Sequence, residues 1–192
     1  MELKDIKIGI ALTGSFCTFE PAFNVIEKLV NIGATVTPII SYAVDELDTR
    51  FYKADEVKTR LKQLTGKNII KDITTAEPVG PKDMFDILII APCTGNTIAK
   101  LSNSITDTPV VMAAKSQLRN KKPVIIAVST NDGLGNNARN IGYLMNMENI
   151  YFVPFSQDDP VKKEMSLVFL EDKLIETIQF ALRGKQIQPV IN

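Results

Sequence analysis

Short apolar runs alternate with segments of helical spacing along most of this chain. The apolar runs lie at 6–12, 35–40, 86–91, 109–113, 123–128 and 150–154. Apolar positions spaced by three and four residues predict helices at about 19–32, 54–65, 94–103, 137–147 and 167–182. Strands that are apolar on both sides need helices over both faces of their sheet. The alternation therefore predicts an α/β fold, a doubly wound (Rossmann-like), mostly parallel sheet with helices on both faces.

Three further segments are predicted to connect these elements. Residues 66–85 are polar and rich in proline and glycine, so we expect a long connection with one short extended piece. Residues 129–136 are expected to form a flexible loop, and residues 155–166 an irregular stretch. A chain of 192 residues, 45% of them hydrophobic, can bury a sizeable core, and we expect a single domain over 1–192.

The composition argues against several classes of function. Lysine plus arginine number 22, as do aspartate plus glutamate, so the formal net charge is zero. This balance argues against a nucleic-acid partner held by bulk charge. No apolar run approaches membrane-spanning length, so we expect no membrane partner and a cytoplasmic protein. The sequence has no histidine, which excludes imidazole acid–base chemistry and histidine metal ligands, and no metal site is expected.

The first predicted strand leads directly into Thr13, Gly14 and Ser15, and then into a predicted helix. Glycine allows a close backbone approach, serine supplies a hydroxyl, and the start of a helix favours an anion. The turn matches neither the G-x-G-x-x-G dinucleotide fingerprint nor a phosphate-binding loop that ends in Gly-Lys-Ser/Thr. It therefore predicts a site for a single phosphate, as in a mononucleotide.

A second strand-to-helix junction has the sequence APCTGNTIAK at 91–100, in which a proline and a glycine are predicted to shape a turn. Thr94, Asn96 and Thr97 place hydroxyl and amide groups beside unpaired amides of the helix, which suits a polar, anionic cofactor. The same residues could instead cap an ordinary helix. Ligands of parallel sheets lie beyond the carboxyl ends of the strands, so both junctions are expected at one edge.

These junctions, together with Ser41-Tyr42-Ala43 after the second strand, resemble the FMN-binding flavoprotein family. That family includes the phosphopantothenoylcysteine decarboxylases and the flavin prenyltransferases. Other loops resemble one branch of it, the flavoprotein subunits of dipicolinate-forming enzymes. Those loops lie at 48–51, 76–82, 112–115, 129–132 and 154–160. The resemblance covers nearly the whole chain.

The resemblance implies a site for FMN, with FAD as the alternative. The residues implied to line it are Gly14, Ser15, Ser41, Thr94, Asn96 and Thr97. For Ser41 the sequence alone is neutral, because a serine that ends a strand is more often a turn former. The resemblance also implies a homo-oligomer, since flavin sites in this family lie between subunits. It further implies a dehydrogenase-type partner subunit that binds NAD(P).

The substrate implied by the resemblance is a cyclic dicarboxylate. It would be a dihydrodipicolinate-type precursor that is oxidised to dipicolinate during sporulation. The alternative is a non-catalytic protein that holds flavin or supports the partner subunit. A dicarboxylate needs cations, and those in or near the predicted loops are Arg50, Lys82, Arg139, Lys162 and Lys163. Arginine is best suited because its planar fork binds a carboxylate through two hydrogen bonds, so Arg50 is the first candidate. Each could instead be a solvated surface residue.

Asp132 and Cys17 are the candidate catalytic residues. Asp132 could act as an acid or base, or it could bond to its own backbone in a turn. Cys17 could lie close to the flavin ring, or it could be a small buried filler. Both Cys17 and Cys93 are expected to be free thiols.

Two departures from the family pattern bear on the chemistry. The decarboxylases carry a catalytic histidine and a P-x-M-N-type motif, where this chain has Asn131-Asp132-Gly133 and no histidine. Decarboxylation by that machinery is therefore not expected. Phe16 stands where the dipicolinate-forming branch commonly has a histidine, and residues 164–166 depart from its proline-containing pattern.

Overall fold

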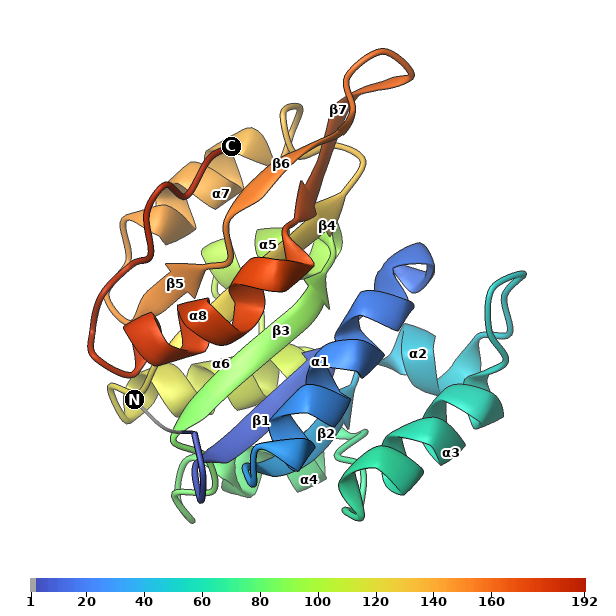
Figure 1. The fold of residues 1–192 in the computed structure, drawn as a ribbon, viewed down its shortest axis with the longest axis vertical. Coiled ribbons are helices and arrows are strands. Elements are labelled where there is room, and N and C mark those ends of the chain that lie inside the picture. Colours follow the sequence, from blue (N-terminus) through green and yellow to red (C-terminus); the bar gives the residue numbers. More distant parts are fainter. Residues whose placement is uncertain (1–2) are drawn as a thin grey trace.

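The computed structural model describes residues 3–192 (Figure 1). Its strands are β1 (Lys7–Leu12), β2 (Thr35–Ile40), β3 (Ile87–Cys93), β4 (Val124–Thr130), β5 (Ile150–Phe152), β6 (Phe155–Asp159) and β7 (Lys163–Phe169). Its helices are α1 (Phe19–Asn31), α2 (Tyr42–Glu46), α3 (Ala54–Thr65), α4 (Ile73–Ala76), α5 (Gly95–Ser102), α6 (Pro109–Arg119), α7 (Ala138–Met145) and α8 (Leu174–Ala181). Short 3₁₀ turns are η1 (Phe16–Thr18), η2 (Glu77–Val79) and η3 (Glu171–Lys173). Within residues 3–192, no helix combines the length and apolar character needed to cross a membrane.

The strands of residues 3–192 form one mixed, mostly parallel sheet with the order β2-β1-β3-β4-β7-β6. β5 lies off this path and pairs in parallel with Val124–Ile126, the amino half of β4. The carboxyl end of β4, Ser129 and Thr130, pairs instead with β7, which runs antiparallel to it. β4 thus changes its outer neighbour halfway along. The hairpin of β6 and β7 therefore stands beside the carboxyl end of the parallel strands (Figure 1).

Helices cover both faces of the sheet, and the predicted fold class is confirmed (Figure 1). Helices α1, α3 and α8 pack with Ile8 and Ile10 of β1 in one hydrophobic cluster. Helices α4 to α7 pack with Leu88 and Ile90 of β3 in the other. Every residue of β3 is buried. Because both faces of these strands are covered, the strands are continuously apolar and do not alternate with polar residues.

The strand predicted at 109–113 is wrong, because these residues begin α6. The Oγ1 of Thr108 accepts a hydrogen bond from the backbone N–H of Val111 (3.4 Å) and caps the helix. Pro109 occupies the first turn, where a missing N–H has no cost. The apolar run reflects a helix face that packs against the sheet, with Val110 and Ala113 fully buried.

The helix predicted at 167–182 is wrong in its first part, and α8 begins only at Leu174. Residues 167–169 belong instead to β7, which forms a hairpin with β6 where the sequence predicts an irregular stretch, and residues 171–173 form η3. Leu167 and Phe169 are buried whereas Val168 is only partly so, which is the two-residue period of a strand. Leucines at 167, 170 and 174 happen to be spaced as in a helix. Because of this spacing, the sequence analysis placed the start of the helix at residue 167.

Two glycines show how closely the core is packed. A Cβ at Gly9 of β1 would lie 2.6 Å from Cδ2 of Phe85 and 3.0 Å from Cδ1 of Leu88. A Cβ at Gly142, on the exposed side of α7, would meet no neighbouring atom within 4 Å. The two positions form a matched pair for testing the packing.

We predict that Gly9→Ala lowers the free energy of unfolding by about 1–3 kcal/mol, because an added methyl forces the Phe85 ring to move. Gly142→Ala should raise it by roughly 0.5–1 kcal/mol, because alanine loses less entropy than glycine in a helix. Urea unfolding followed by circular dichroism measures both changes. Equal effects at the two positions would contradict the contact of β1 with Phe85.

Candidate functional site

A cleft of about 520 Å³ opens at the carboxyl ends of β1, β3 and β4. Its walls are formed by residues 14–17, 50–51, 129–131, Thr94 and Lys163. Parallel sheets bind ligands at this edge. The cleft therefore combines both predicted strand-to-helix junctions with the loop between α2 and α3 and with the β6–β7 hairpin.

Hydroxyl groups tie the three strand ends together beneath the cleft. The Oγ1 of Thr13, a buried residue, donates to the carbonyl of Pro92 (2.8 Å) and accepts from the backbone N–H of Thr94 (2.9 Å). The Oγ atoms of Ser15 and Ser129 share a hydrogen bond of 2.8 Å. The junctions after β1, β3 and β4 thus form one connected unit.

The second junction combines a helix cap with an exposed polar wall. The Oγ1 of Thr94 accepts from the backbone N–H of Thr97 (3.4 Å) and lies 3.1 Å from the Thr97 hydroxyl. The ordinary capping interpretation is therefore correct for Thr94, but the same residue also lines the cleft. Thr97 is buried behind it, and Asn96 is exposed and does not line the cleft. A hydroxyl with two lone pairs and one proton can serve a cap and a ligand together.

Ser41 lies at the end of β2, beside the first junction. Its backbone N–H donates to the carbonyl of Leu12 (3.0 Å), while its buried Oγ has no hydrogen-bond partner among the described residues. Gly14 lies nearby, since a Cβ there would be 3.6 Å from that of Ala43 in α2. A buried hydroxyl without a partner costs free energy. This orphaned oxygen is suited to a polar group of a ligand.

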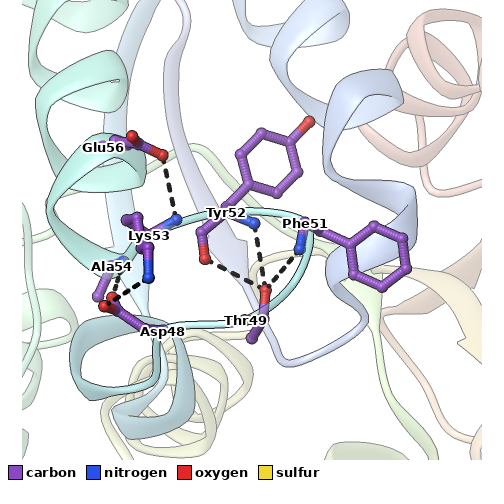
Figure 2. A network of polar contacts seen from close by, with 7 residues as sticks. All are labelled: Asp48, Thr49, Phe51, Tyr52, Lys53, Ala54 and Glu56. Carbon is purple, nitrogen blue, oxygen red and sulfur yellow. Dashed lines mark hydrogen bonds and ion pairs between the residues drawn. The ribbon is translucent and has the colours of Figure 1, made fainter.

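The loop that carries Arg50 is closed by its own hydrogen bonds (Figure 2). The Oγ1 of Thr49 accepts from the backbone N–H groups of Phe51 and Tyr52, each at 3.2 Å. The same hydroxyl donates to the carbonyl of Tyr52 (3.2 Å). Arg50 lies inside this turn, and its guanidinium carbon is 4.8 Å from the centroid of the Phe51 ring. The part of the cleft wall that Arg50 and Phe51 form is therefore held in place by hydrogen bonds within its own loop.

Contacts on both sides anchor this loop to the helices. The Asp48 carboxylate accepts from the backbone N–H of Ala54 (3.0 Å) and pairs with the Lys53 ammonium (3.2 Å), as Figure 2 shows. These two contacts hold the pKa of Asp48 below its usual value. On the other side, the ring of Tyr52 stacks on Phe19 of α1 with centroids 5.6 Å apart. Burial and a hydrogen bond to Glu20 raise the pKa of Tyr52, so its hydroxyl stays protonated.

The carboxylate of Asp132 is engaged within its own loop. Its Oδ1 accepts from the Thr130 hydroxyl (2.5 Å) and its Oδ2 from the side-chain amide of Asn137 (2.8 Å). This loop packs tightly against α5, because a Cβ at Gly95 would lie 2.7 Å from Asp132 Oδ1. Asp132 does not line the cleft. Both partners are side chains, whereas the turn interpretation expects the carboxylate to bond to its own backbone. The catalytic role stays a prediction.

The other predicted site residues are more widely spread. Cys17 is exposed and lines the cleft, so its interpretation as a buried filler is wrong, whereas Cys93 is buried and burial raises its pKa. Both cysteines are free, as predicted. Lys82 precedes the amino end of β3, whereas the cleft lies at the carboxyl end. Arg139 in the first turn of α7 and Lys162 in the β6–β7 turn are exposed, and neither lines the cleft.

Sequence reasoning did not single out Phe51, Ser129 or Thr130 as site residues, although all three line the cleft. Two signals pointed to them: their place in or next to loops that follow strands, at the edge where parallel sheets bind ligands, and the family resemblance of the loops 48–51 and 129–132. Which of those loop residues faces the cleft depends on turn geometry, and no spacing rule predicts it.

The fold is that of a flavoprotein. The sequence model of the flavoprotein family matches residues 1–177, and the chain belongs to that family. It is 48% identical over 189 residues to the B subunit of dipicolinate synthase from Bacillus subtilis (strain 168), a match that covers 98% of this chain and 94% of that protein. The resemblance to the dipicolinate-forming branch is thereby confirmed.

Two solved structures extend the comparison. The crystal structure of the dipicolinate synthase B subunit from Bacillus halodurans C matches with a TM-score of 0.92 at 46% identity, covering 100% of this chain and 98% of that one. The FMN binding protein AtHal3 matches with a TM-score of 0.67 at 16% identity, covering 96% and 100%. At that identity the likeness concerns the fold alone.

We predict that Thr13→Val lowers the free energy of unfolding by about 1–3 kcal/mol. Valine keeps the shape of threonine but leaves the backbone N–H of Thr94 without its partner. Thr35→Val makes the same chemical change on the exposed edge of β2 and should alter stability by less than about 0.5 kcal/mol. Urea unfolding compares the two variants. A Thr13→Val protein as stable as Thr35→Val would show that this hydroxyl does not hold the strand ends.

Proposed function

We propose that this chain is the flavin-binding B subunit of a dipicolinate synthase. In this proposal it takes part in oxidising a dihydrodipicolinate-type precursor to dipicolinate during sporulation. The observation that carries the proposal is the 48% identity, over 98% of the chain, to a protein of that name. The cleft at the carboxyl edge of the sheet supports it, because its groups suit both a flavin and an anionic substrate.

The residues at the cleft fit a flavin mononucleotide. Ser15 and Thr94 offer hydroxyls, and the turn at Gly14 leaves room for a close approach. Ser41 does not line the cleft, but beside the first junction it has a buried oxygen without a hydrogen-bond partner among the described residues. We propose that these residues hold the phosphate and the ribityl chain. A flavin, when bound, supplies the capacity to accept two electrons. FAD is the alternative cofactor, and we place NAD(P) on a dehydrogenase-type A subunit.

The chain's own residues would bind the substrate and move its protons. Arg50 presents at the cleft wall a guanidinium that pairs with no carboxylate of residues 3–192. The rings of Phe16 and Phe51 line the same space and suit the flat face of a six-membered ring. Of the two candidate catalytic residues, Cys17 lines the cleft, whereas the carboxylate of Asp132 is engaged in its loop. Cys17 is therefore the better placed of the two to contact a bound flavin or substrate.

The first test concerns the phosphate. Ser15→Asp should weaken FMN binding by at least about tenfold, because the new carboxylate repels the phosphate and a hydrogen bond to a charged group is lost. Ser104→Asp adds the same charge to an exposed residue that does not line the cleft, and it should bind FMN as the wild type does. Titration of FMN into each apoprotein, followed by flavin fluorescence, measures the difference. Equal affinities of the two variants for FMN would show that the phosphate does not bind at the turn of Ser15.

The second test concerns Arg50. Arg50→Ala should weaken substrate binding by about 1.5–3 kcal/mol, and Arg50→Lys by less, because lysine keeps the charge without the fork. Arg183 is the matched control, since its guanidinium also lies 4.8 Å from a phenylalanine ring, that of Phe180, but it does not line the cleft. The variants at Arg50 and Arg183 should all keep the FMN affinity of the wild type.

The measurement for Arg50 is aromatisation by the reconstituted two-subunit enzyme across precursor concentrations. An unchanged KM and maximal rate in Arg50→Ala would make Arg50 a surface residue. The same reconstitution separates the two proposed roles of the chain. Aromatisation that requires FMN on this subunit supports catalysis, whereas assembly without flavin turnover supports the non-catalytic alternative.

The third test concerns assembly. We propose a homo-oligomer with shared sites, in addition to contact with the A subunit. Sedimentation at micromolar concentration should give a mass well above the 21.2 kDa of one chain. A monomer that retains bound flavin would contradict the shared sites.

A further inference from the structure

Two charged residues line the cleft, and both are cations. Arg50 contributes from the loop between α2 and α3, and Lys163 contributes from the start of β7. Every other lining residue is uncharged. The chain as a whole has a formal net charge of zero, so this is a local excess. Two cations around one cleft favour a ligand with two negative charges.

Arg50 is free to bind an anion. Within residues 3–192 it pairs with no carboxylate, and its guanidinium packs 4.8 Å from the centroid of the Phe51 ring. Its loop is fixed by the Thr49 hydroxyl (Figure 2). The planar fork is therefore held near the cleft with its hydrogen-bond donors unused by protein acids.

Lys163 is held in place but is not saturated. Its Nζ lies 2.5 Å from Oδ2 of Asp158, on the neighbouring strand β6. The hydrogen bond and charge of Asp158 raise the pKa of Lys163, so the ammonium is protonated at neutral pH. An ammonium has three donors, and one is used by Asp158. The side chain is 54% exposed, so the other donors are accessible to a ligand.

The neighbouring cation Lys162 does not have this position. Lys162 borders a separate hollow that it shares with Val161 and Glu164, on the hairpin itself. Lys163 borders both that hollow and the cleft. The hairpin therefore brings one of its two adjacent lysines to the cleft.

We propose that Arg50 and Lys163 bind the two carboxylates of one planar ring, and that Lys163 makes the site select a dicarboxylate over a monocarboxylate. The inference rests on the proposed function and refines its substrate site. Arg50 binds one carboxylate through its fork. Lys163, positioned by Asp158, binds the second from the β6–β7 hairpin.

The experiment titrates the full chain, loaded with FMN, with dipicolinate and with picolinate in a calorimeter. The two probes share the pyridine ring and differ by one carboxylate. The variants are Lys163→Gln, Lys162→Gln and Lys173→Gln. Lys173 is the charge control, because it lies at the start of α8 in a loose pair with Glu176 (3.4 Å) and does not line the cleft.

Lys163→Gln should weaken dipicolinate binding by about tenfold and leave picolinate and FMN affinity unchanged. Lys162→Gln and Lys173→Gln should bind both probes as the wild type does. The inference is overturned if Lys163→Gln keeps its preference for dipicolinate, if Lys162→Gln is the variant that loses it, or if the loss is in FMN affinity. A wild-type chain that binds FMN but not dipicolinate would instead overturn the proposed function, and the inference with it.

Discussion

The hydroxyl of Thr13 is the interaction on which the site depends. It joins the end of β1 to the end of β3 by donating to one backbone group and accepting from another. The Ser15–Ser129 hydrogen bond then adds the end of β4. Parallel strands have no short turns to fix their ends relative to one another. Side-chain hydrogen bonds therefore set the floor of the cleft and the positions of the groups around it.

The walls of the cleft follow a different rule. Besides the strand-to-helix junctions, they include two segments outside the parallel core, the loop with Arg50 and the β6–β7 hairpin with Lys163. Each segment is stabilised by contacts of its own, through Thr49 in the loop and the Asp158 ion pair in the hairpin. Segments that are stabilised by their own contacts can change without disturbing the parallel core that holds the floor of the cleft.

The same division explains which predictions succeeded. Strands and helices of the parallel core were predicted to within about two residues, because burial on both faces leaves an apolar run and burial on one face leaves a helical period. The predictions at 109–113 and 167–173 failed. An apolar run at 109–113 is compatible with a strand or a buried helix, and the proline-led cap decided it. At β7 a few leucines imitated the helical period while the chain was pairing with β4.

The sequence by itself determined the fold class, the edge of the sheet that carries the cleft, and the two junctions with Ser15 and Thr94. It did so because hydrophobic period, turn residues and helix-start donors are local properties of the chain. Only the tertiary structure decided which residues face one another. It placed Arg50 and Lys163 at one cleft, left Lys82 at the far end of β3, and engaged Asp132 within its loop. These outcomes depend on contacts between residues distant in sequence, which no local pattern encodes.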